Sequence, residues 1–231
     1  ILVGMSNYED GRAEVPSVSR IAFADGKIGA LTGLPGQPAS AGALCLADID
    51  GDGDLDLFAG SRVMPGRYPE PVSPRMFRND DGELQPDSEN NGALKDIGLV
   101  TGSCFTDFNS DGWPDLVLAS EWGPVRLFRN ERGKLVSWDA PVTINHRPST
   151  INQLCGWWNG VVAGDIDGDG RMDLIVGNWG LNSEYHASME HPVRIFYGDF
   201  GGNGTVDLFE GYDVPSLGVA PRPNLLAVSK A

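Results

Sequence analysis

Four segments of the 231-residue chain carry side-chain oxygens at a spacing that suits a hard metal ion. The pattern is Asp-x-Asp-x-Asp-Gly-x-x-Asp, and its copies begin at Asp48, Asp107, Asp165 and Asp199. Ca²⁺ prefers roughly six to eight oxygen ligands. Oxygens at positions 1, 3, 5 and 9 and a backbone carbonyl at position 7 can supply them, while glycine at position 6 permits the sharp turn. The spacing therefore predicts calcium-binding loops.

The predicted ligands include the residue at position 7 of each loop, which would contribute only its carbonyl oxygen. Three loops are expected to bind strongly and the fourth weakly, because Gly201 stands at its third position. The predicted metal ligands are Asp48, Asp50, Asp52, Asp54, Asp56, Asp107, Asn109, Asp111, Trp113, Asp115, Asp165, Asp167, Asp169, Arg171, Asp173, Asp199, Asn203, Thr205 and Asp207.

Two alternatives to this interpretation are an EF-hand and a set of acidic turns without metal. An EF-hand requires a bidentate Glu at position 12 and flanking helices. Position 12 is Ala59, Leu118 and Val176 in the first three loops, each within an apolar run typical of a strand, and only the fourth loop has Glu210 there. An EF-hand is therefore disfavoured, whereas a metal-free turn remains an alternative, above all for the fourth loop.

A second repeated phrase places the loops within a larger unit. Residues 75–79, Arg-Met-Phe-Arg-Asn, match residues 126–130, Arg-Leu-Phe-Arg-Asn, and residues 194–197 look like a partial copy. Each unit is predicted to contain a strand, the acidic loop, a second strand, a long loop, a third strand with the phrase, a turn and a fourth strand.

This order predicts an all-β fold, a β-propeller or partial propeller of four-stranded blades whose calcium loops join the first two strands. We expect one domain over residues 1–231. The expected blade portions are about 1–40, 41–98, 99–155, 156–198 and 199–231. The number of blades is left open, because a ring of this repeat is larger, and the chain is either a fragment of such a ring or closes with partner material.

The loops resemble FG-GAP/VCBS repeats such as those of the integrin α-subunit propeller. Longer phrases resemble proteins of the ASPIC/UnbV (cartilage acidic protein-like) type. Those phrases lie at residues 54–62, 65–69, 111–115, 156–159 and 177–183. The resemblance covers about residues 1–212 and implies a propeller, calcium in the loops, and a secreted, periplasmic or cell-surface location.

Composition narrows the range of partners. The chain has 32 acidic and 17 basic residues and a net charge of −15, which disfavours nucleic acid because phosphate would be repelled. No apolar run approaches the roughly 18 residues of a membrane span. The chain has three cysteines, a small and odd number that argues against a disulfide framework. The expected partner is a glycan or a protein.

A candidate ligand face lies on the side of the blades away from the calcium loops. The loops there carry Arg62, Arg67, Glu121, Trp122, Trp157, Trp158 and Trp179, together with Tyr68. Aromatic faces combined with a few polar groups suit a sugar or another polar ligand. The alternative is structural, with tryptophans packed between blades and arginines tying loops together.

The sequence favours a secreted calcium-binding module for glycan or protein, with no catalytic residue assigned. One alternative is a polysaccharide lyase or hydrolase that uses the same face, with Tyr185 or His186 as a base. Another is a structural subunit of a larger assembly. The sequence contains neither a nucleophile elbow nor a phosphate-binding loop, so we expect binding rather than catalysis.

Overall fold

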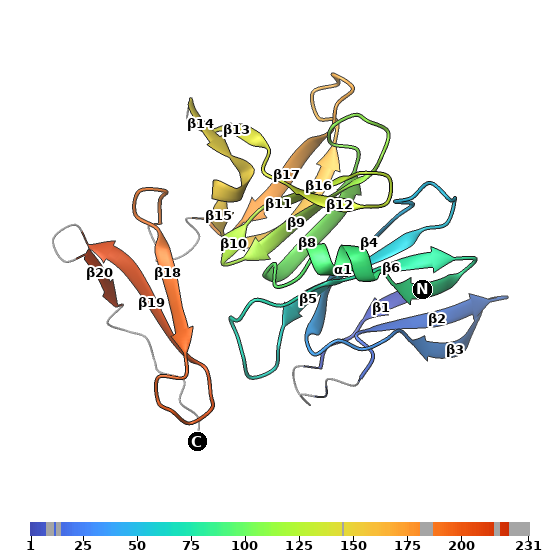
Figure 1. Cartoon of the computed structure of the whole chain (residues 1–231), viewed down its shortest axis with the longest axis horizontal. Coiled ribbons are helices and arrows are strands. Elements are labelled where there is room, and N and C mark those ends of the chain that lie inside the picture. The colour runs from blue at the N-terminus through green and yellow to red at the C-terminus, as the bar shows by residue number, and fades with distance from the viewer. Residues whose placement is uncertain (8–11, 13–14, 145, 181–186, 215–217, 222–231) are drawn as a thin grey trace.

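Strands dominate the computed structural model of this chain (Figure 1). The helical elements of the described part are the short helix α1 (Ser88–Ala93) and a single 3₁₀ turn (Ile151–Gln153). The described residues are 1–7, 12, 15–144, 146–180, 187–214 and 218–221. Two residues named above as possible bases, Tyr185 and His186, lie outside them.

Two four-stranded antiparallel sheets form the centre of the fold. The first has the order β4 (Ser40–Ala47), β5 (Asp56–Val63), β6 (Arg75–Asp80) and β7 (Glu83–Pro86). The second has the order β8 (Leu99–Thr106), β9 (Asp115–Glu121), β11 (Arg126–Asn130) and β12 (Leu135–Trp138). In both sheets the acidic loop joins the first two strands and the repeated phrase forms the third, as the sequence predicts.

Smaller sheets precede and follow this pair. β1 (Leu2–Gly4), β2 (Val18–Ala24) and β3 (Lys27–Gly33) come first, and β16 (Trp158–Gly164) with β17 (Asp173–Asn178) follows. A last sheet contains β18 (Val193–Gly198), β19 (Asp207–Val214) and β20 (Gly218–Pro221). Two short pairings join β10 (Gly123–Pro124) to β15 (Cys155–Gly156) and β13 (Pro141–Ile144) to β14 (Arg147–Thr150).

The structure corrects one expectation about the third unit. Residues 194–197 do not form a third strand beside β17, because β18 pairs with β19 across the fourth acidic loop, with Ile195 opposite Glu210. The interval between the third and fourth loops is short, so the next strand pair begins where the earlier units place their third strand. Within the described part of the chain the sheets form an open series and no closed ring (Figure 1).

Successive sheets pack face to face because the central strands are apolar on both sides. Phe58 points into the cluster shared with the second sheet, whereas its neighbour Leu57 points into the cluster shared with β2. In β9, Leu116 and Val117 alternate in the same way, toward the first sheet and toward β16–β17. Alternation along a strand thus places one hydrophobic layer on each side of a sheet.

The first strands of three units approach one another closely. A Cβ on Gly42 would lie 2.5 Å from the Val100 carbonyl oxygen, and one on Gly102 would lie 2.6 Å from the Gly160 Cα. Only glycine permits backbones to lie this close.

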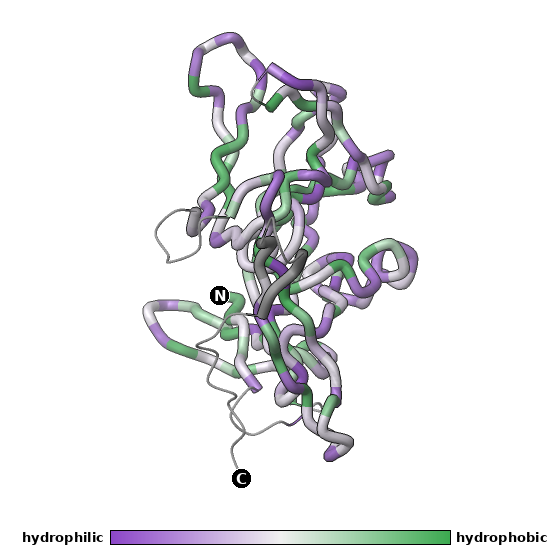
Figure 2. Tube along the Cα trace, turned by 90° about the vertical axis from the view of Figure 1, so that its left-hand side faces the viewer, coloured by the Kyte–Doolittle hydropathy of each residue, from purple (hydrophilic) through white to green (hydrophobic). Residues whose placement is uncertain are grey.

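The polypeptide alternates between hydrophobic and hydrophilic segments along most of its trace (Figure 2), and none of its described helices has the length and apolar character needed to cross a bilayer.

A buried asparagine joins the two central sheets, and we expect its removal to be destabilising. The Asn130 side chain is almost fully buried; it donates to the Ile49 carbonyl at 2.8 Å and accepts from the Gly133 N–H at 2.7 Å. Asn130→Ala should lower the free energy of unfolding by roughly 2–6 kcal/mol, because two buried backbone groups each lose their partner at a cost of about 1–3 kcal/mol. Urea unfolding followed by tryptophan fluorescence measures this loss.

The equivalent asparagine of the first sheet is the matched control. Asn79 is half-buried, but its hydrogen bond to the Leu55 carbonyl, at 3.1 Å, is exposed, so that water can replace it. Asn79→Ala should therefore cost clearly less than Asn130→Ala. Equal losses for the two variants would contradict the role of Asn130 as a link between sheets.

Candidate functional site

The four acidic loops share one hydrogen-bonding pattern, which begins at the first aspartate. Asp48 accepts the Gly51 N–H at 2.7 Å with one carboxylate oxygen and the Gly53 N–H at 2.9 Å with the other. The glycine at position 6 donates to the first aspartate in the other three loops as well: Gly112 to Asp107 at 2.8 Å, Gly170 to Asp165 at 3.0 Å and Gly204 to Asp199 at 2.8 Å.

The residue at position 5 also makes the same hydrogen bond in all four loops. The side-chain oxygen of the residue at position 5 accepts the N–H of the residue at position 7. This hydrogen bond fixes the turn, and with it the direction of the position 7 carbonyl, the predicted metal ligand. The pairs are Asp54 to Asp52 at 2.8 Å, Trp113 to Asp111 at 2.9 Å, Arg171 to Asp169 at 2.8 Å and Thr205 to Asn203 at 3.0 Å. All four loops therefore adopt the same backbone turn, although the fourth lacks two carboxylates, with Gly201 at position 3 and Asn203 at position 5.

The last aspartate of the loop has a second task that the sequence pattern did not predict. Asp56 and Asp115 are fully buried, and each accepts one N–H from its own loop and one from the third strand of its sheet. Burial raises the pKa of both carboxyl groups, and these hydrogen bonds oppose the rise. The position 9 carboxylate thus ties the loop to the sheet.

Two loops bring three carboxylates close enough to hold a metal ion. Oxygens of Asp48, Asp50 and Asp56 lie within 4.8 Å of one another, and Asp165, Asp167 and Asp173 form an equivalent group. Oxygens arranged this way fit a hard cation, because ligands on opposite sides of Ca²⁺ stand roughly 5 Å apart. Among the described residues the second and fourth loops gather no such trio, since Asn109 and Gly201 replace carboxylates.

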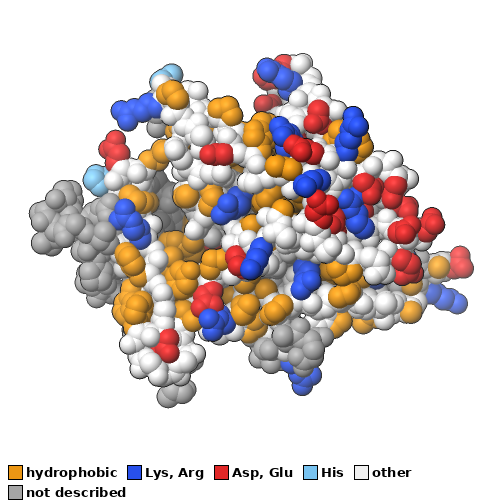
Figure 3. All heavy atoms as spheres, viewed as in Figure 1, with side chains coloured by type: hydrophobic (Ala, Val, Ile, Leu, Met, Phe, Trp, Pro, Cys, Tyr) orange, Lys and Arg blue, Asp and Glu red, His pale blue; other side chains and the backbone are white. Residues whose placement is uncertain are grey.

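A positive side chain already lies beside the first trio. The Arg78 guanidinium is 2.6 Å from Asp50 and 3.6 Å from Asp56, and it also reaches Asp87 at 2.9 Å and the Gly133 carbonyl. In the third loop, Arg171 pairs with Asp169 at 2.5 Å. Acidic side chains gather on the right side of the molecule in Figure 3, around the turns of the first sheet. Arg78 therefore partly neutralises the carboxylates of the first loop.

The opposite ends of the same strands carry the candidate ligand face. β9 begins at Asp115 and ends at Glu121, so a strand of about 20 Å separates the two sites. The Glu121 side chain is 3% exposed and forms an ion pair with Arg62. Tyr68 donates its hydroxyl to Glu121 at 2.9 Å and accepts the Trp122 indole N–H at 2.7 Å. Burial raises the pKa of Tyr68, so its hydroxyl stays a donor.

Three tryptophans from separate segments meet beside this network. The Trp157 ring centroid lies 5.0 Å from that of Trp122 and 4.6 Å from that of Trp179. Trp179 is 43% exposed. Trp122 follows β9, Trp157 precedes β16 and Trp179 follows β17, so only the packing of the sheets brings them together. We call Arg62, Tyr68, Glu121, Trp122, Trp157 and Trp179 the tryptophan face.

Two residues expected on this face have other contacts. Trp158 donates its indole N–H to the Leu154 carbonyl at 2.8 Å and packs against the core between β9 and β16. Arg67 forms a forked ion pair with Glu70, at 2.5 and 2.7 Å. The structure instead places Tyr68 at the centre of the network. The sequence indicated this role of Tyr68 only through its position in the same loop as Arg62 and Arg67.

Comparisons with known proteins identify the repeats. The family described as FG-GAP-like repeat matches residues 107–176, which contain the second and third acidic loops. Phosphatidylinositol-glycan-specific phospholipase D of Rattus norvegicus is 29% identical over 209 residues, covering 77% of this chain and 24% of that protein. The same enzyme of Bos taurus is 31% identical over 156 residues, covering 59% of this chain and 18% of that protein.

The chain spans about a quarter or less of the length of these curated relatives. Residues 107–176 thus match the FG-GAP-like repeat family, and they lie within an all-β fold. The narrower resemblance to the ASPIC/UnbV type remains a proposal.

Proposed function

We propose that this protein is a calcium-binding interaction module that acts outside the cytoplasm, as a secreted, periplasmic or cell-surface protein. Calcium in the acidic loops fixes one end of the sheets, and the tryptophan face at the other end binds a glycan or a protein. The observation that carries the proposal is the meeting of Trp122, Trp157 and Trp179 beside the ion pair that Arg62 forms with the buried Glu121.

The chemistry of this face suits recognition. Aromatic rings supply large contact areas at small cost in conformational entropy, and the fixed ion pair and hydroxyl add direction. The exposed part of Trp179 offers a surface for stacking, whereas Glu121 and Tyr68 hold Trp122 in place. Calcium supports this arrangement indirectly, because metal ligands and face residues stand at opposite ends of the same strands.

No described contact favours the enzyme alternative over binding. A lyase or hydrolase would need a base beside the tryptophan face, and the bases considered for it, Tyr185 and His186, are outside the described residues. The phospholipase D activity named for the relatives belongs to proteins about four times as long as the matched segment. We therefore propose binding alone.

Two tryptophan variants test the proposal against the structural alternative. Trp179→Ala should leave the melting temperature almost unchanged, because the ring is partly exposed, and should weaken ligand binding about two- to tenfold by loss of a stacking contact. Trp158→Ala should destabilise the protein by about 3–5 kcal/mol, because a packed indole leaves a cavity. Thermal melts in calcium and a glycan array probed with wild type and both variants give the two readouts.

One combination of melting and binding results would contradict the proposed binding face. Should Trp179→Ala melt as early as Trp158→Ala while every ligand of the wild type is retained, the tryptophans are packing residues and the face binds nothing.

A further inference from the structure

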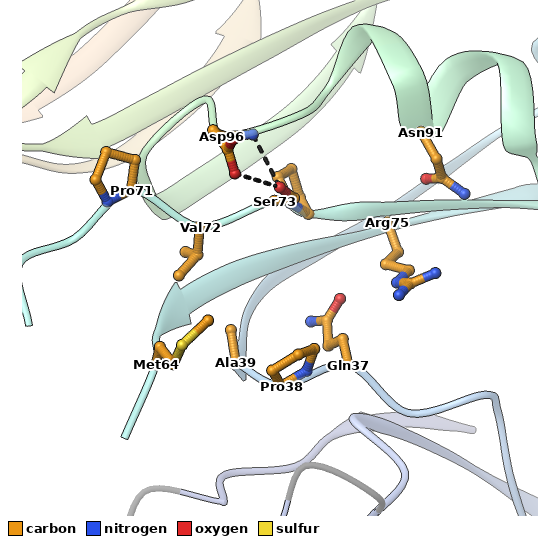
Figure 4. A pocket seen from close by; sticks show the side chains of 11 residues that line it. Gln37, Pro38, Ala39, Met64, Pro71, Val72, Ser73, Arg75, Asn91 and Asp96 are labelled. Atoms are coloured by element: carbon orange, nitrogen blue, oxygen red, sulfur yellow. Dashed lines mark hydrogen bonds between the residues drawn. The ribbon is translucent and has the colours of Figure 1, made fainter. Parts of the chain in front are cut away.

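A cavity of about 320 Å³ lies among the segments that surround the first sheet (Figure 4). Its walls come from the segment before β4, the loop between β5 and β6, and the chain between α1 and β8. Met64 and Val72 line it and also belong to the apolar cluster that contains Tyr68 and Trp122. The cavity and the tryptophan face are therefore neighbours.

One wall of the cavity holds a buried amide without partners. Gln37 is 1% exposed, yet neither its side-chain oxygen nor its side-chain nitrogen has a hydrogen-bond partner within the described part of the chain. Figure 4 shows its amide rising from the lower wall into the space. A buried amide that makes no hydrogen bond is costly, and native proteins leave few of them. Gln37 therefore offers both its amide NH₂ and its carbonyl oxygen to a bound molecule.

The opposite wall holds a cation. Arg75 opens β6, and its guanidinium forms no hydrogen bond or ion pair with any described residue. Arg126, its counterpart in the second sheet, donates to the Ile97 carbonyl at 3.1 Å. In Figure 4 the Arg75 side chain descends toward the Gln37 amide. The two groups thus face one cavity from opposite sides.

We propose that this cavity binds the carboxy-terminal residue of a partner polypeptide. A guanidinium fork matches a carboxylate. The Gln37 oxygen can accept the N–H of the same terminal residue while its NH₂ donates to the carboxylate or to the preceding carbonyl. Met64, Val72 and the wall prolines Pro38, Pro71 and Pro74 suit a small aliphatic side chain.

These walls favour a peptide over a sugar acid, because the apolar part of the lining is aliphatic and contains no aromatic ring for a sugar to stack on. Ser73 and Asp96 do not compete for the carboxylate, since they are hydrogen-bonded to each other at 2.8 and 3.0 Å. Asp96 also adds negative charge at the wall, so the ligand carboxylate must lie on the Arg75 side. The inference deepens the proposed interaction function by naming a partner chemistry.

Fluorescence anisotropy in calcium buffer tests this site with labelled hexapeptides. One probe ends in valine with a free carboxylate and its control carries a carboxy-terminal amide. The wild type should bind the acid at least about tenfold more tightly than the amide, because a charge-assisted fork is lost in the amide. Arg75→Gln should remove that difference. Arg129→Gln, which makes the same charge change at an exposed position, should preserve it.

Gln37→Met separates a binding role from a structural one. Because it deletes two unpartnered polar atoms from a buried position, it should keep or raise the melting temperature while weakening the acid probe about tenfold. Equal binding of acid and amide, binding of neither, or capture of galacturonate in place of the peptide acid would each overturn the inference. The glycan-array result for Trp179→Ala is independent of these outcomes, so the interaction function could survive them.

Discussion

Removal of calcium is expected to lower the melting temperature by several degrees. At millimolar Ca²⁺ and a dissociation constant of ~10⁻⁴–10⁻³ M, each occupied loop adds roughly 0.4–1.4 kcal/mol of stability. The three strong loops together would add roughly 1–4 kcal/mol, and for a domain of this size each kcal/mol shifts the melting temperature by about 2–4 °C. Calorimetric melts in calcium and in chelator measure the shift.

Variants of the first aspartate in each acidic loop show how much each loop contributes to the calcium-dependent shift in melting temperature. Asp48→Ala, Asp107→Ala and Asp165→Ala should each remove one bound ion and part of the calcium-dependent shift, whereas Asp199→Ala should matter least because Gly201 has already removed a ligand from its loop. Metal analysis of the native protein counts the ions. Superimposable melts with and without chelator, in a protein that contains no metal, would contradict the calcium proposal.

The regular part of this fold follows directly from sequence spacing. Asp-rich loops, the apolar runs beside them and the phrase at residues 75–79 and 126–130 predict both four-stranded sheets in the order that the structure has. The prediction works because each feature is local. A loop turn depends on residues only five apart, such as Asp48 and Gly53, and strand alternation depends on immediate neighbours.

Features that depend on packing between units could not be predicted in the same way. Tyr68 meets Glu121 across more than fifty residues, and Gln37 and Arg75 line one cavity although they come from separate segments. The pairing of β18 with β19 was mispredicted because a partial match to the third-strand phrase competed with the strand position before an acidic loop. Trp158 and Trp157 are adjacent in sequence, yet only their packing shows which is structural.

Loss of the Asp115 side chain should lower the free energy of unfolding by more than loss of the Asp107 side chain in the same loop. Most of this loss should not depend on calcium. This fully buried carboxylate accepts the Phe108 N–H at 3.2 Å and the Asn130 N–H at 2.8 Å. Asp115→Ala leaves two backbone donors unpaired, each at a cost of about 1–3 kcal/mol, so roughly 2–6 kcal/mol should be lost. Since these hydrogen bonds need no metal, most of the loss should persist in chelator, and calcium should add only the roughly 0.4–1.4 kcal/mol of its own site.

Asp107→Ala is the matched control in the same loop. Its carboxylate accepts the N–H groups of Asp111 and Gly112 at an exposed turn, where water can take its place. Its stability loss should therefore appear in calcium and largely vanish in chelator, in contrast to that of Asp115→Ala. Urea unfolding of both variants under the two conditions gives the comparison. If chelator abolished the effect of Asp115→Ala as well, position 9 would act only through the metal, and its role as a tie between loop and sheet would be wrong.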